Sequence, residues 1–179
     1  MNKEQKEAVK RLKKSEGFEK GVSYPVLSKA DIEKFMEATG GLHDAVIVGA
    51  AYSNARWMPN GSITASENDE VLVVTVKSQW VDMDIELIFV GLRRANLVGF
   101  QTNYGSFMLS SYLDFYNDLI VFADDDSFNP ADLRVNTWIE ESCSRWRKKT
   151  TTKDVEVETL LREPMTTFIV SKTLTWRLV

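Results

Sequence analysis

The amino-acid sequence predicts an α+β protein in which two N-terminal helices precede a mainly antiparallel β-sheet. Three observations favour this class. Early segments place apolar residues at helical spacing, later segments alternate apolar and polar residues, and turn residues separate the two kinds of pattern. A chain of 179 residues with 44% hydrophobic and 27% charged residues suits one domain. We therefore expect a single domain over 1–179, with a helical extension at 1–40 and a β-rich core at 41–179.

Two helices are expected within the extension. Residues 2–15 are charged and carry only a thin apolar stripe, so this helix has little surface to bury. The second helix begins after Ser28, which stands three residues before Asp31 as in a capping box. Gly40 and Gly41 supply a left-handed stop that ends this helix.

Four stretches have the composition or alternation of β-strands, and the turn dipeptide Asn60-Gly61 follows the first of them. The predicted strands are residues 45–52, 70–77, 81–89 and 119–122. Within the third strand, Asp82, Asp84 and Glu86 alternate with apolar residues. This pattern is typical of a strand with one face in water and one on the core.

The last third of the chain allows one further helix and more strands. Asn129 and Pro130 are typical of a helix start, and residues 130–149 place apolar side chains on one helical face. The β-branched residues in this segment leave a strand as the alternative. Residues 154–160 alternate like a strand, and residues 167–179 predict a final strand or a pair of strands.

The scarcity of histidine and cysteine restricts the chemistry of this protein. His43 and Cys143 are the only residues of their kinds, so the all-Cys/His zinc patterns and an intrachain disulfide cannot form. We predict no metal and no cofactor. The stretch from Gly91 to Arg94 also lacks the spacing of a phosphate-binding loop. The single cysteine, a polar N-terminus and the lack of an apolar run of about 20 residues predict a cytoplasmic protein that does not cross a membrane.

The charge distribution points to the class of partner. The net charge is −4, residues 1–20 carry seven basic and four acidic side chains, and no basic residue occurs between Arg94 and Arg134. Such a surface repels nucleic-acid phosphates and attracts a basic protein. The candidate partner-binding residues are Asp82, Asp84, Glu86, Asp124, Asp125 and Asp126. The alternatives for these carboxylates are a solvated strand face or turn, a glycosidase pair and a cation site, and the last fails the EF-hand spacing.

A second candidate site surrounds the lone histidine. His43 and Asp44 stand at the entrance of a predicted strand, and residues 100–122 are crowded with aromatic side chains. A pocket formed with Tyr112 and Tyr116 would suit a small-ligand binder or a hydrolase. Because neighbouring residues on a strand face opposite ways, Asp44 need not orient His43. A structural role for His43, such as capping a helix end or bridging backbone carbonyls, is favoured because the sequence offers no clear nucleophile as its partner.

Two short stretches resemble a loose group of small bacterial proteins, some of which are similar to immunity proteins that neutralise toxins. They are Leu42-His43-Asp44-Ala45-Val46-Ile47 and Ile169-Val170-Ser171-Lys172-Thr173-Leu174-Thr175-Trp176-Arg177. The resemblance implies a β-rich domain with an interaction role and transfers no catalytic residue. From the sequence we expect a non-enzymatic binding protein, with the small-ligand binder or hydrolase as the alternative.

Overall fold

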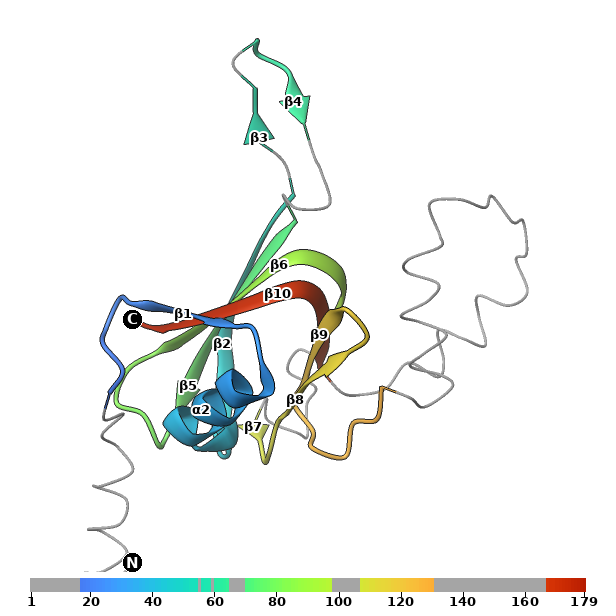
Figure 1. Cartoon of the computed structure of the whole chain (residues 1–179). Coiled ribbons are helices and arrows are strands. Elements are labelled where there is room, and N and C mark those ends of the chain that lie inside the picture. The colour runs from blue at the N-terminus through green and yellow to red at the C-terminus, as the bar shows by residue number, and fades with distance from the viewer. Residues whose placement is uncertain (1–16, 55, 59, 65–69, 98–106, 131–166) are drawn as a thin grey trace, which may run out of the picture.

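The computed structural model describes residues 17–54, 56–58, 60–64, 70–97, 107–130 and 167–179. Eight strands within these ranges form one strongly curved sheet, and an α-helix lies against its concave side (Figure 1). The strands of the sheet are β1 (Ser23–Val26), β2 (Ala45–Ser53), β5 (Val71–Ser78), β6 (Ile85–Asn96), β7 (Phe107–Met108), β8 (Tyr112–Tyr116), β9 (Leu119–Ala123) and β10 (Phe168–Leu178).

A small two-stranded ribbon projects from the main sheet (Figure 1). It consists of β3 (Arg56–Trp57) and β4 (Ile63–Thr64), which pair antiparallel. The predicted turn at Asn60-Gly61 lies between them, where Gly61 has a φ of 78° and the Asn60 side chain accepts a hydrogen bond from the Ser62 amide at 3.0 Å. A positive φ and an asparagine that closes its own turn are the properties that make this dipeptide a turn former.

The main sheet is antiparallel and has the order β7-β2-β5-β6-β10-β9-β8. One edge of β10 pairs with β6 over most of its length, while its other edge is shared by β9 at 168–171 and β1 at 174–177. A register shift between Val170 and Ser171 marks where β10 bends between these two partners. Opposite this bend, Gly91 has a φ of 67° and lies directly against the Lys172 side chain. Such irregularities increase local twist and bend a sheet.

The helix α2 (Lys29–Thr39) has the ends that the sequence predicts. The Ser28 hydroxyl accepts a hydrogen bond from the Asp31 amide at 3.3 Å and donates to the Asp31 carboxylate at 2.7 Å. Gly40 ends the helix in the left-handed conformation, and a short 3-10 turn, η1 (Gly40–Leu42), follows. None of the helices in these ranges has the length and apolarity that crossing a membrane requires.

The α+β class and the antiparallel sheet are confirmed, while only one of the predicted helices, α2, falls within the described residues. The predicted helices at 2–15 and 130–149 and the predicted strand at 154–160 lie outside them. Residues 23–39, which we assigned to an N-terminal extension, provide β1 and α2 to the sheet and its core.

The third predicted strand has different bounds in the structure. We expected it at 81–89, but β6 begins at Ile85 and continues to Asn96. Asp82 and Asp84 therefore lie in the connection before the strand, and only Glu86 belongs to it. The alternating pattern placed the start of this strand too early because Val81, which lies in the connection, is also buried.

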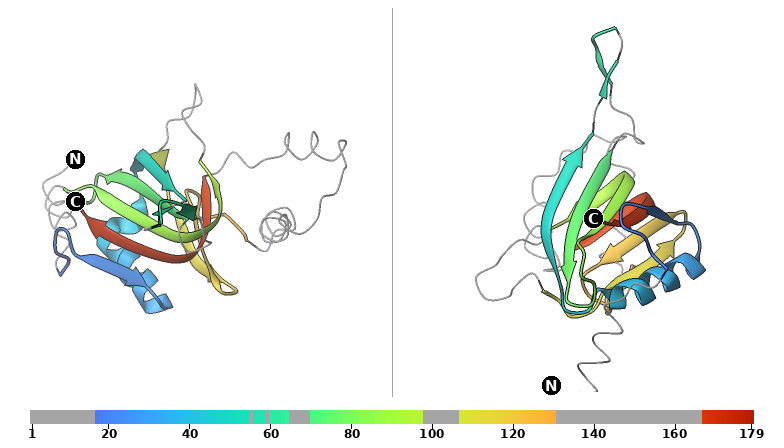
Figure 2. Two further views of the ribbon diagram at one scale, coloured as in Figure 1. Left: turned by 90° about the horizontal axis from the view of Figure 1, so that it is seen from above. Right: turned by 90° about the vertical axis from the view of Figure 1, so that its left-hand side faces the viewer.

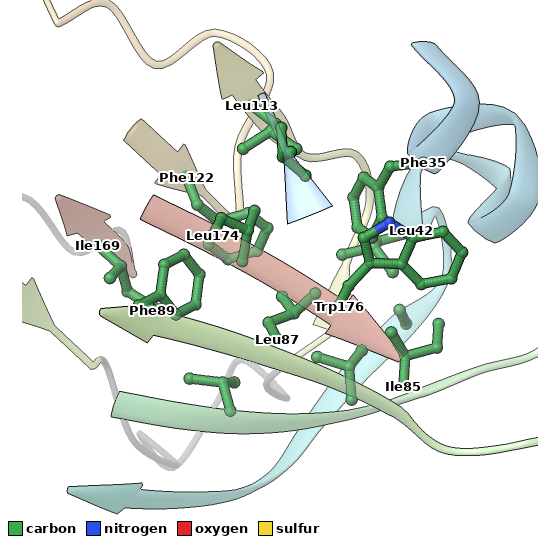
Figure 3. Close-up of a cluster of buried hydrophobic side chains, with 14 of the residues drawn as sticks. Phe35, Leu42, Ile85, Leu87, Phe89, Leu113, Phe122, Ile169, Leu174 and Trp176 are labelled. Atoms are coloured by element: carbon green, nitrogen blue, oxygen red, sulfur yellow. The ribbon is translucent and has the colours of Figure 1, made fainter. Parts of the chain in front are cut away.

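The main core lies between α2 and the concave face of the sheet (Figure 3). Phe35 on α2 is fully buried and meets the Trp176 ring of β10 at 5.4 Å between centroids. Leu87 and Phe89 of β6 and Phe122 of β9 point into the same cluster. Burial of one such side chain contributes about 1.5–3 kcal/mol, so this cluster is a main source of stability.

A second apolar cluster uses the opposite face of β9 and β10. Val121 and Ala123 of β9 and Phe168 and Val170 of β10 are buried there, and Phe128 packs against them. Both faces of these strands are therefore apolar. This explains why residues 119–122 form a continuous hydrophobic run instead of alternating.

Candidate functional site

The first three candidate carboxylates do not form a ladder along one strand. Glu86 lies opposite Arg177 in the pairing of β6 with β10. Its Oε2 accepts one hydrogen bond from Arg177 Nε at 2.6 Å and lies 2.6 Å from Arg177 Nη2. Asp84 Oδ1 lies 3.7 Å from Lys77 Nζ, and the Asp84 carbonyl accepts the Val179 amide at 2.9 Å. Glu86 and Asp84 thus hold strands and the C-terminus together within the protein.

Asp124 and Asp125 shape the chain where it leaves β9. Asp124 exchanges two hydrogen bonds of 3.0 Å with Thr167, one from its amide to the Thr167 carbonyl and one from the Thr167 amide to its carboxylate. Burial raises the pKa of Asp124 above its usual range, although the bonds from Thr167 act in the opposite direction. The Asp125 carboxylate accepts the Ser127 amide at 2.8 Å and so closes the next turn.

Asp126 is exposed and lies beside a second loop. Its amide donates to Ser110 Oγ at 3.4 Å, which brings the connection between β7 and β8 next to the turn after β9. In that connection Leu109 is 71% exposed, and Ser111 anchors the loop by donating to the Gly41 carbonyl at 2.8 Å. We name Leu109, Ser110, Asp125 and Asp126 the 109–126 surface. It combines an exposed apolar side chain with carboxylates.

The structure also bears on a metal site at the aspartate run. Within the described part of the chain, no three His, Cys, Asp or Glu side chains gather closely enough to hold a metal ion. Asp124 and Asp125 instead accept hydrogen bonds from the protein's own backbone.

His43 and Asp44 contact each other, which differs from our expectation for neighbouring strand residues. Asp44 has a φ of 54°, and β2 begins only at Ala45, so the alternation of a strand does not apply to this pair. His43 Nδ1 lies 2.8 Å from Asp44 Oδ2, and the same oxygen accepts a hydrogen bond from Gln79 Nε2. The His43 ring meets Trp80 edge-on at 6.4 Å. The carboxylate therefore orients the imidazole, which remains about half exposed.

The structure places the two candidate tyrosines in a different neighbourhood. Tyr112 and Tyr116 lie on β8 and pack against the second apolar cluster, where the Tyr112 ring is 5.8 Å from Phe128. Burial, and then the neighbouring Asp114 charge, raise the pKa of Tyr112. His43 contacts Trp80 and Asp44 instead. These contacts place His43 and the two tyrosines in different clusters and do not bring them together in one pocket.

An open hollow of about 530 Å³ lies elsewhere, where β2, β5 and β6 meet. Its apolar lining includes Tyr52, Leu72, Leu92 and Leu97. Sequence reasoning missed this site because its residues come from three strands and share no motif. The only local signal was the pair of arginines after Gly91, which we had tested only against the pattern of a phosphate-binding loop.

Comparisons of this chain with protein-family models, with curated proteins and with solved structures give no match.

Proposed function

We propose that this chain is a non-enzymatic protein-binding domain whose partner is basic. The observation that carries the proposal is the hydrogen bond from the Asp126 amide to Ser110 Oγ, because it joins an exposed leucine to the aspartate run in one surface. An inhibitor of the immunity type, which neutralises a basic protein by covering it, would use a surface of this kind.

The composition of the 109–126 surface supports this function. Leu109 offers an apolar anchor, and burial of a few such anchors supplies most of the energy of a protein interface. Asp125 and Asp126 lie at its rim, in a stretch from residue 95 to 133 that contains no lysine or arginine. Rim charges of one sign attract a partner of the opposite sign and raise its association rate.

The anchor is tested with a pair of leucine variants. The partner is captured from an extract of the source cell, identified and purified, and its affinity for the full chain is measured by calorimetry. Leu109→Ser should weaken binding about tenfold, because a buried anchor contributes more than ~1 kcal/mol. Leu27→Ser is the matched control, since Leu27 is 72% exposed and Leu109 is 71% exposed.

The charged rim is tested through association rates. Asp126→Lys should slow association several-fold at about 0.05 M salt and have little effect at about 0.5 M, where charges are screened. Glu33→Lys makes the same change of charge on the exposed side of α2 and should leave the rate nearly unchanged. Equal effects of the matched variants in both tests would contradict the proposal.

The alternative function, a small-ligand binder or hydrolase around His43, has one observation in its favour. Asp44 holds the His43 imidazole at 2.8 Å, an arrangement that also suits a general base. A hydrolytic activity that is lost in His43→Gln, in a chain that captures no basic partner, would establish that function instead.

A further inference from the structure

The turn that closes the ribbon of β3 and β4 contains a chemically reactive dipeptide, Asn60-Gly61. The main-chain nitrogen of the residue that follows an asparagine can attack the side-chain carbonyl carbon and close a five-membered ring. Glycine hinders this attack least because it has no side chain. The space around Gly61 is also open, since an added Cβ would meet nothing within 4 Å among the described residues other than its chain neighbours.

The position of the turn makes it accessible to water. Asn60, Gly61 and Ser62 are all exposed, and Figure 1 and the right-hand view of Figure 2 show the ribbon standing away from the main sheet. Each strand of the ribbon has two residues, and a two-stranded hairpin is only marginally stable by itself. The Gly61 amide donates to the Met58 carbonyl at 2.9 Å, and in such a ribbon this bond opens at low cost and frees the attacking nitrogen.

Ser62 holds the oxygen on which charge develops during the attack. Asn60 Oδ1 accepts two hydrogen bonds from Ser62, one from its amide at 3.0 Å and one from its hydroxyl at 2.7 Å. These bonds join residues two positions apart, so they do not depend on the pairing of β3 with β4. Donors aimed at an oxygen that becomes negative in the transition state lower the barrier. Ser62 therefore favours ring closure at Asn60.

We propose that Asn60 is a site of spontaneous modification, where the chain converts its own asparagine to aspartate and isoaspartate with water as the only co-reactant. Hydroxide removes the Gly61 amide proton, and the Gly61 nitrogen bonds to Asn60 Cγ. The bond from Cγ to Nδ2 then breaks, and Nδ2 takes a proton from water and leaves as ammonia. Water finally opens the cyclic imide, at Cγ to give aspartate or at the main-chain carbonyl to give isoaspartate. No oxidation or reduction is involved, and the site does not depend on the 109–126 surface.

The two products affect the ribbon differently. Aspartate leaves the path of the main chain unchanged, adds one negative charge and still offers an oxygen to Ser62. Isoaspartate inserts one methylene group into the main chain of the turn, and the length of the turn sets the register of a hairpin. The register that pairs Arg56 with Thr64 and Trp57 with Ile63 is therefore lost in the isoaspartate form.

The experiment follows conversion in the full chain at mildly alkaline pH. Samples are digested, chromatography separates the aspartate and isoaspartate peptides, and mass spectrometry locates a mass increase of about 1 Da, which results from replacing an amide NH2 with OH. Asn117 is the internal reference, because it is also exposed, in the turn between β8 and β9, but is followed by Asp118. Asn60 should convert at least about tenfold faster than Asn117, since the side chain and charge of Asp118 oppose the attack.

Substitutions test the contribution of each neighbour. Ser62→Ala should slow conversion of Asn60 about threefold, because a donor in water contributes less than one in a water-excluded site. Ser62→Thr keeps the hydroxyl and should keep the rate. Asp118→Gly recreates the reactive dipeptide in the other turn and should accelerate conversion of Asn117. NMR spectra of the fresh and converted proteins show whether the ribbon keeps its cross-strand contacts.

Each outcome bears on a separate part of the proposal. Absence of conversion at Asn60, or equal rates at Asn60 and Asn117, would overturn the site itself. An unchanged or faster rate in Ser62→Ala, with the ribbon intact, would overturn the role of Ser62. Cross-strand contacts that persist in the isoaspartate form would overturn the expected loss of register.

Discussion

At the scale of single residues, local backbone conformation decides which side chains meet. Leu42 and Asp44 each have a φ of 54°, a left-handed conformation in which side chains no longer follow the alternation of a strand. The contact between His43 and Asp44 therefore arises in the turn before β2. Gly40, which ends α2, has a φ of 64°, and an added Cβ would lie 3.0 Å from the Trp80 ring. Glycine is therefore needed here for two reasons: the backbone is left-handed, and the Trp80 ring leaves no room for a side chain.

A partly buried carboxylate gives the first prediction. Burial raises the folded-state pKa of Asp124, so the folded protein holds this proton more tightly than the unfolded chain does. The resulting stability is present below the unfolded pKa, about 3.9, and is lost as pH rises through the folded pKa. Asp124→Asn cannot lose a proton, so its stability should rise relative to the wild type as the pH increases above about 4.

Urea unfolding at a series of pH values checks this dependence. Asp126→Asn is the control, because Asp126 is exposed and its amide hydrogen bond does not use the carboxylate. A difference between Asp124→Asn and the wild type that stays constant or shrinks with rising pH would contradict the prediction.

At the scale of elements, β10 organises the sheet because it pairs with three other strands. β6 covers one edge, and β9 and β1 divide the other edge at the bend between Val170 and Ser171. The pair Glu86 and Arg177 lies where β6 meets the C-terminal half of β10. Opposite charges directly across two strands support their register, and they also remove Glu86 from the set of carboxylates available to a partner.

This ion pair gives the second prediction. In a double-mutant cycle of Glu86→Gln and Arg177→Gln, the coupling free energy should be about 0.2–1 kcal/mol, because both side chains are partly in water. It should decrease in about 1 M salt, where charges are screened within a few ångströms. Denaturant unfolding of the four proteins measures the coupling. A value of zero at low salt would show that the contact does not stabilise the strand pair.

At the scale of the whole molecule, a short helix and a long curved sheet together make both the core and its open end. α2 fills the concave face around Trp176, and the face beyond the helix remains as the hollow at Tyr52 and Leu97. The 109–126 surface lies near the other end of the helix, where Ser111 is bonded to the Gly41 carbonyl. The hollow and the 109–126 surface therefore lie at separate places on the sheet, and α2 covers only one end of its concave side (Figure 2).

The contact between helix and sheet gives the third prediction. Phe35→Ala should reduce the free energy of unfolding by about 3–5 kcal/mol, because it leaves a cavity against Trp176. Leu27→Ala, at an exposed position just before the helix, should change it by less than about 0.5 kcal/mol. Chemical denaturation followed by circular dichroism measures both variants. Similar losses in the two would contradict the packing described here.

The sequence by itself determined the local elements. Apolar spacing and capping residues located α2, and β-branched composition located β2, β5 and β9 to within one or two residues. It also identified Asp124, Asp125 and Asp126 as one exposed candidate run, of which Asp126 remains exposed in the fold. These features depend on neighbours within a few positions along the chain, which a pattern can record.

Tertiary structure alone decided which distant residues meet. Glu86 pairs with Arg177, Asp126 lies beside Ser110, and the hollow combines residues of β2, β5 and β6. The sequence does not record these contacts because they follow from strand order, register and the bend of β10, each set by packing of the whole core. A pattern of alternation says which side chains share a face of one strand, while only the folded sheet says what lies across from them.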